Sequence, residues 1–123
     1  MNEPRMLPPS MRPKKRYIIF EIISESPVEF KEFSATAWNS FLSTLGEAHI
    51  SEARIWIIPN LYDGRKQKGV LRCGNAYVED VRAALAMVSI VGESRAIIKA
   101  IGVTGTIKSA REKYADPNLK DYA

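Results

Sequence analysis

The chain has 123 residues, 46% of them hydrophobic and 26% charged, a composition typical of one ordinary soluble globular domain. Its 18 Lys and Arg exceed its 14 Asp and Glu, which gives a formal net charge of +4. A single cysteine excludes an intramolecular disulfide, and a single histidine excludes a histidine cluster for zinc. The sequence contains no run of about 18 apolar residues, so a transmembrane helix is not expected. We therefore expect a cytoplasmic protein with neither a membrane span nor a signal peptide.

The first feature along the chain is a proline-rich segment that leads into a basic arm. Residues 1–11 contain Pro4, Pro8 and Pro9 with little periodicity, which predicts an extended, mobile tail. Residues 1–16 hold five Lys or Arg and one Glu, whereas the rest of the chain holds 13 basic and 13 acidic residues. The positive charge is therefore local, and it is concentrated in the basic arm, Arg12, Lys14, Lys15 and Arg16. Such a cluster can neutralise phosphates, which favours a polyanion partner; the alternative is a solvated tail that keeps the protein soluble.

The first half of the chain predicts a strand, a helix and a second strand. Residues 16–23 are rich in Ile, Tyr and Phe, as strands are. Residues 28–45 follow a helical period, with apolar side chains on one face at Phe30, Phe33, Ala37, Phe41 and Leu45. Gly46 comes directly afterwards and is suited to cap the helix C-terminus. Residues 52–58 predict the second strand, because Pro59-Asn60 follows as a breaker.

The second half predicts a hairpin, a second helix, a further strand and a last helix. Asp63-Gly64 is a turn signal, so residues 69–73 are expected to pair with the second strand. Asn75 is expected to cap the second helix, which ends at Gly92 and has an apolar stripe at Val78, Val81, Leu85 and Val88. Residues 94–103 predict the fourth strand, and residues 104–116 predict the last helix.

The order β-α-β-β-α-β with an added C-terminal helix predicts an α+β fold. It is the ferredoxin-like, RRM-like sandwich, in which two helices cover one face of a four-stranded sheet. We expect a tail over residues 1–11 and a single domain over residues 12–123. Strand alternation assigns to the helix-covered face Ile18, Phe20, Ile22, Ile55, Ile57, Leu71, Ile98 and Ala100. The alternate face carries Tyr17, Glu21, Arg54, Trp56, Arg72 and Lys99, a mixture typical of a face that meets water or a partner.

Two further basic segments complete the predicted RNA-binding set. The loop before the third strand, and that strand itself, carry Arg65, Lys66, Lys68 and Arg72. The last helix carries Lys108, Arg111 and Lys113, and the turn before it leaves backbone N–H groups that can hold a phosphate. The alternatives are a charged hairpin tip that blunts a sheet edge and an ordinary helix cap by Thr104 or Thr106.

The alternate sheet face also predicts a protein interface. Related RNA-binding sheets stack bases on aromatics of the first and third strands, but residues 70–73 supply no aromatic. Base stacking of that kind is therefore not expected. The predicted partner interface comprises the aromatic and apolar members of this face, Tyr17, Ile19, Trp56, Ile58 and Ile101.

The sequence offers no catalytic constellation. Cys73 falls on a core-facing strand position and lacks an evident base, so we interpret it as a buried structural cysteine. The carboxylates are scattered, and no phosphate-cradling glycine loop is present. We expect no catalytic residue and no metal site on the protein itself.

Three segments carry a resemblance to a known family. They are residues 7–18 (LPPSMRPKKRYI), residues 69–73 (GVLRC) leading into residues 78–85 (VEDVRAAL), and residues 97–107 (IIKAIGVTGTI). Together they span almost the whole chain. On these segments the sequence resembles the archaeal ribonuclease P protein component 2 family, the counterpart of a Pop-series subunit of the eukaryotic ribonuclease P and MRP particles.

The resemblance implies a noncatalytic subunit of a ribozyme whose RNA removes the 5′ leader from precursor tRNA, using magnesium held by the RNA. It implies contact with ribonuclease P RNA and with a TIM-barrel-like protein, component 3, and indirect contact with precursor tRNA, with a homodimer within a heterotetramer as one possible assembly. We further expect Lys and Arg on a rigid scaffold to replace part of the magnesium demand. Two alternatives stay open: a ferredoxin-like ligand-binding regulatory module and a scaffold that binds only protein.

Overall fold

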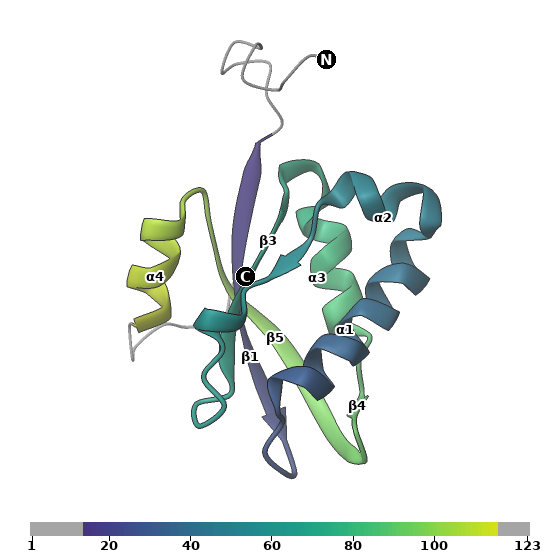
Figure 1. Cartoon of the computed structure of the whole chain (residues 1–123), viewed down its shortest axis with the longest axis vertical. Coiled ribbons are helices and arrows are strands. Elements are labelled where there is room, and N and C mark those ends of the chain that lie inside the picture. Colours follow the sequence, from purple (N-terminus) through teal and green to yellow (C-terminus); the bar gives the residue numbers. More distant parts are fainter. Residues whose placement is uncertain (1–13, 116–123) are drawn as a thin grey trace.

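The computed structural model describes residues 14–115, which form one antiparallel sheet with helices on both faces (Figure 1). The strands are β1 (Lys15–Ser24), β2 (Trp56–Ile57), β3 (Lys68–Gly74), β4 (Ile90–Val91) and β5 (Ser94–Thr104), in the spatial order β2-β3-β1-β5-β4. The helices are α1 (Phe30–Leu45), α2 (Glu47–Ala53), α3 (Val78–Ala86) and α4 (Ile107–Ala115), with 3₁₀ turns at Pro59–Leu61 and Asn75–Tyr77. The predicted α+β, ferredoxin-like fold is confirmed.

The larger hydrophobic core lies between the sheet and the helices α1, α2 and α3, which Figure 1 shows together on one side. Phe20 on β1 stacks on Phe33 of α1 with ring centroids 4.6 Å apart, and both side chains are fully buried. The predicted core-facing set is confirmed: Ile18, Phe20, Ile22, Ile55, Ile57, Leu71 and Ile98 are buried in this core, and Ala100 packs against it.

A second, smaller core lies on the other face of the sheet, beneath α4. It contains Ile19, Ile58, Val70, Ile101 and Ala110. Strand β1 is therefore covered on both faces, and Ile18, Ile19 and Phe20 are each 0% exposed. This double cover explains why residues 18–20 are all apolar, since a strand with one solvent-exposed face would alternate apolar and polar residues.

The predicted second strand is wrong over most of its length. Of residues 52–58, Glu52 and Ala53 belong to helix α2, and only Trp56–Ile57 pairs with β3. Gly46, with φ of 79°, ends α1 by donating its N–H to the Leu42 carbonyl, as predicted, and α2 begins at the next residue. Arg54, at φ of 51°, ends α2 in the left-handed region, and strand geometry begins only afterwards.

The predicted second helix is also shorter than expected. Helix α3 ends at Ala86 instead of Gly92, and Gly92, at φ of 63°, forms the tight turn between β4 and β5. Asn75 does not cap α3, because a 3₁₀ turn separates it from the helix. The sheet therefore gains a fifth strand, which the predicted four-stranded order lacked. Residues 1–11 and Arg12 lie outside the described residues, as does Asp116 of the predicted last helix.

The close pairing of Phe20 with Gly69 yields a stability prediction. A Cβ added at Gly69 would lie 2.5 Å from Cζ of Phe20, whose ring is held against Phe33. Gly69→Ala should therefore lower the free energy of unfolding by about 1–3 kcal/mol, the usual cost of overpacking a core. Urea unfolding measures this change. Gly64→Ala is the matched control, because the nearest atom to its added Cβ is 3.8 Å away; equal unfolding midpoints for the two variants would contradict the prediction.

Candidate nucleic-acid interface

The described residues of the basic arm, Lys14, Lys15 and Arg16, lie at one end of the sheet. Lys15 pairs with Gly74 at the end of β3, Tyr17 pairs with Thr104 at the end of β5, and α4 begins just beyond (Figure 1). The Lys14 carbonyl accepts a hydrogen bond of 2.8 Å from the Asn75 N–H. The arm is thus held by backbone pairing from Lys14 onward, with the side chains of Lys14 and Lys15 exposed.

Arg16 is less exposed than its neighbours. Its side chain is half-buried, and Nη1 donates a 3.0 Å hydrogen bond to the Lys15 carbonyl. The same Nη1 lies 3.8 Å from the position a Cβ would occupy on Gly105, in the turn that leads into α4. Arg16 therefore extends the positive surface from β1 toward the start of α4.

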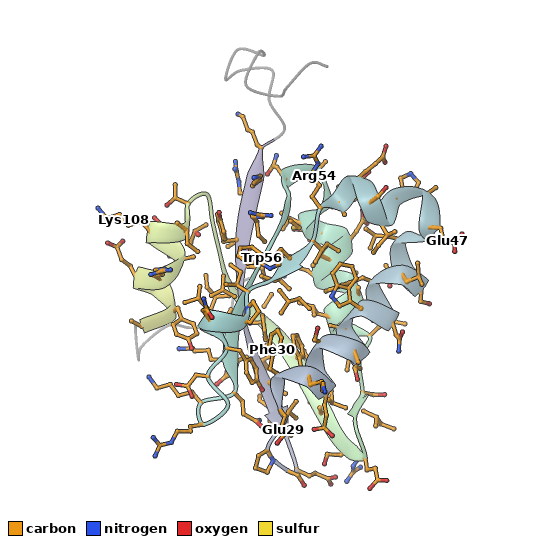
Figure 2. All side chains as sticks on the ribbon, viewed as in Figure 1. Glu29, Phe30, Glu47, Arg54, Trp56 and Lys108 are labelled. Atoms are coloured by element: carbon orange, nitrogen blue, oxygen red, sulfur yellow. The ribbon has the colours of Figure 1, made fainter. Side chains whose placement is uncertain are left out.

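Helix α4 presents three exposed cations, Lys108, Arg111 and Lys113. Figure 2 shows Lys108 on the side of α4 that points away from the sheet, near the end where β1 begins. The Thr106 hydroxyl accepts a 3.1 Å hydrogen bond from the Ser109 N–H, and the Thr104 hydroxyl donates one of 3.1 Å to the Thr106 carbonyl. Thr106 thus forms the ordinary helix cap that was the alternative interpretation of this turn, and Thr104 bonds to the turn carbonyl.

The basic loop before β3 lies at the opposite end of the sheet (Figure 1). Lys68 pairs with Glu21, six residues along β1 from Lys15, a separation of about 20 Å in an extended strand. The Asp63 carboxylate accepts hydrogen bonds from the backbone N–H groups of Arg65 (2.9 Å) and Lys66 (3.3 Å), and these bonds, with the nearby charges of the two side chains, lower the pKa of Asp63. The predicted RNA-binding residues therefore divide between two ends of the molecule.

Lys68 has a structural partner. Its ammonium donates a 3.2 Å hydrogen bond to the Tyr114 carbonyl in the last turn of α4 and lies 5.9 Å from the centroid of the Tyr114 ring. A cation at the C-terminal end of a helix also meets the negative end of the helix dipole. Lys68 therefore attaches the end of α4 to the sheet, and its contact with RNA stays a prediction.

A row of three side chains crosses the sheet next to α4. Trp56 of β2 pairs with Arg72 of β3, and Arg72 pairs with Tyr17 of β1. The Arg72 guanidinium carbon lies 5.0 Å from the centroid of the Trp56 ring, within range of a cation–π interaction. Trp56 is 47% exposed, whereas Arg72 and Tyr17 are half-buried.

The other predicted interface residues are covered by the chain itself. Ile19, Ile58 and Ile101 are at most 5% exposed, because α4 packs over them. The expectation that they line an open face is therefore not met. Their contact with a partner protein stays a prediction, and it would require α4 to move.

Cys73 is buried in the larger core. Burial raises the pKa of the Cys73 thiol to about 12, which keeps it protonated at neutral pH. Among residues 14–115, no three His, Cys, Asp or Glu side chains lie together as a metal site would require. No helix in that range has the length and apolar character needed to cross a membrane.

The fold and the site define a small α+β protein of the ferredoxin-like class, with cations fixed at both ends of its sheet. The sequence model of the Rpp14/Pop5 family matches residues 16–115, and the chain belongs to that family. It is 42% identical to ribonuclease P protein component 2 of Pyrococcus furiosus over 92% of each chain. It is 34% identical to the protein of that name from Methanothermobacter thermautotrophicus, over 95% of this chain and 98% of the relative. The family resemblance seen in the sequence is confirmed.

Cys73 provides a test of burial by chemical reactivity. With a pKa of about 12, roughly one thiol in ten thousand is ionised at pH 8, and only the thiolate attacks disulfide reagents. The folded protein should therefore react with Ellman's reagent orders of magnitude more slowly than the guanidinium-unfolded chain. Because the unfolded thiol ionises near pH ~8.5, the cysteine's contribution to stability should fall as pH rises above that value. Rapid stoichiometric reaction of the folded chain would contradict this assignment.

Substitutions at Lys68 and Lys66 separate the attachment of α4 to the sheet from the mere loss of a positive charge. Lys68→Ala removes the hydrogen bond to the Tyr114 carbonyl and should lower the free energy of unfolding by about 1 kcal/mol. Lys66→Ala removes the same charge from an exposed loop position and should leave stability within about 0.5 kcal/mol of the parent. Thermal unfolding of both variants gives the comparison, and equal melting temperatures would count against the attachment role.

Proposed function

We propose that this chain is a noncatalytic protein subunit of ribonuclease P, which supports an RNA catalyst in removing the 5′ leader from precursor tRNA. The observation that carries the proposal is the likeness to proteins named ribonuclease P protein component 2, across more than nine tenths of both chains in several archaea. The absence of a catalytic constellation in the sequence is consistent with this role. We also propose that the protein acts in the cytoplasm.

The proposed mechanism is electrostatic. A compact RNA brings phosphates together, and their repulsion normally demands a high concentration of magnesium. Lys14 and Lys15 are exposed cations on a paired backbone, so they can approach phosphates without a further loss of backbone entropy on binding. Such contacts position the RNA and leave the chemistry to RNA-bound magnesium. The protein then needs no cofactor of its own.

A protein partner is part of the same proposal. The family resemblance implies pairing with a TIM-barrel-like subunit, component 3, and the assembly could include a homodimer of this chain. Trp38 and Leu42 are 38% and 44% exposed and lie one helical turn apart on α1. Exposed apolar side chains in this arrangement support contact with a protein, which is also what a scaffold function would need.

The proposal predicts a magnesium effect of the basic arm. Lys14→Ala/Lys15→Ala should raise the magnesium concentration needed for half-maximal cleavage, because two phosphate contacts are lost. It should also reduce the salt slope of RNA binding by roughly 1.5 log units per decade of salt. Lys31→Glu is the control, since it changes the net charge equally from an exposed position on α1. An unchanged magnesium profile in the double variant would contradict the mechanism.

The function itself is tested by reconstitution. Precursor tRNA is incubated at low magnesium with an archaeal ribonuclease P RNA, with and without this chain, and with and without its TIM-barrel-like partner. We expect cleavage only when both proteins are present. No stimulation with an RNA that is active at high magnesium would count against the subunit function and favour a regulatory module.

A further inference from the structure

Trp56 is an exposed aromatic in a basic setting. It lies on the edge strand β2, where the flanking Ile55 and Ile57 are buried and Trp56 itself is 47% exposed. Figure 2 shows it on the sheet between α4 and the helices of the opposite face. The exposed part of the indole is therefore available to a stacking partner.

Arg72 fixes the orientation of this indole. Its guanidinium lies over the Trp56 ring at 5.0 Å, and its Nε is buried without a hydrogen-bond partner among the described residues. None of the ion pairs in residues 14–115 neutralises it. A guanidinium that is stacked and unpaired keeps its positive charge available next to the aromatic surface.

The surroundings of Trp56 are cationic. Arg54 is exposed and lies two residues before Trp56, just after α2. On the other side, Arg72 pairs with Tyr17, and the exposed Lys15 lies two residues before Tyr17 on the same face of the sheet. The nearest carboxylate in the chain sequence is Glu52, which accepts a 2.8 Å hydrogen bond from the Tyr77 hydroxyl. An apolar protein surface would meet these charges unfavourably, whereas a polyanion would meet them favourably.

A flat aromatic surface beside unpaired cations matches an unpaired nucleotide. The base has a π face that stacks on indole regardless of its identity, and the phosphates on either side need positive charge. A duplex hides its base faces, so the ligand must be single-stranded RNA, such as a loop or a bulge.

We propose that Trp56 and Arg72 form a stacking site for an unpaired nucleobase, with the adjacent phosphates held by Arg54 and Lys15. The inference rests on the proposed function and names an RNA element that this face contacts. It revises the sequence interpretation, which assigned Trp56 to a protein interface because the third strand lacks an aromatic. Arg72 lies on β3, the strand on which related RNA-binding sheets carry an aromatic, and the aromatic of this site comes from β2 instead.

The first experiment follows Trp56 fluorescence directly. Trp38→Phe leaves Trp56 as the sole tryptophan of the chain. Titration with an oligoadenylate of about twelve nucleotides should quench its emission to saturation, because the stacked base contacts the indole. Sodium polyphosphate of similar charge is the control and should leave the emission nearly unchanged. Oligoadenylate binding that leaves the emission unchanged, or equal quenching by polyphosphate, would overturn the site.

The second experiment compares two tryptophan substitutions for binding to ribonuclease P RNA. Trp56→Leu should weaken binding about tenfold while leaving the salt slope unchanged, because it removes a stacking contact and no cation. Met87→Ala is the control, because it removes an apolar side chain that is 75% exposed and outside both proposed contact surfaces, and it should bind like the parent. Trp56→Phe keeps a smaller ring and should recover part of the loss, which separates stacking from a folding defect.

The outcomes distinguish this inference from the proposed function. Equal RNA binding by Trp56→Leu and the parent, in a chain that still stimulates cleavage, would overturn the stacking site and leave the subunit function standing. Loss of protein-partner binding by Trp56→Leu with RNA affinity intact would also overturn it, in favour of a protein interface. Failure of cleavage stimulation together with saturable Trp56 quenching would count against the subunit function alone.

Discussion

The structure depends on the burial of strand β1 from both sides. Ile18 and Phe20 point into the larger core while Ile19 points into the smaller one, and all three are fully buried. Because side chains alternate across a strand, this double burial fixes the register of β1 against both of its neighbours: a slip of one residue would exchange the two cores. The backbone positions of the charged residues at the start of β1 are therefore fixed by the same register.

The position of α4 follows from the same constraint. Its Ala110 packs on Ile19 and Ile101, and its C-terminal end is attached to the sheet by Lys68. The helix therefore takes up the sheet face that related RNA-binding sheets leave open for bases. Among residues 14–115, the margin of that face with Trp56 and Arg72 stays outside the cover of α4, and Lys14, Lys15 and the outward side of α4 are exposed.

The periodicity of the sequence predicted the element order and the main core because both are set by local alternation. It missed α2, because the buried residues Ala53, Ile55 and Ile57 alternate as in a strand, although the first of them is the last residue of a helix. It could not predict that α4 covers Ile19, Ile58 and Ile101, since long-range packing has no local signature. Nor could it show that the cations divide between two ends, or that Arg72 stacks on Trp56, because both depend on register.

The division of charge has a mechanical consequence for RNA binding. Two basic ends about 20 Å apart on a rigid strand cannot both contact one phosphate, so under the proposed function they would contact RNA phosphates at two separate positions. A flexible tail of equal charge would bind RNA, but it would leave the distance between those stretches free. The paired backbone of Lys14 and the loop held at Asp63 set that distance instead. Under the proposed function, a protein that contacts RNA at two points of fixed separation would replace magnesium through geometry as well as through charge, and a base stacked on Trp56 would add a third fixed point.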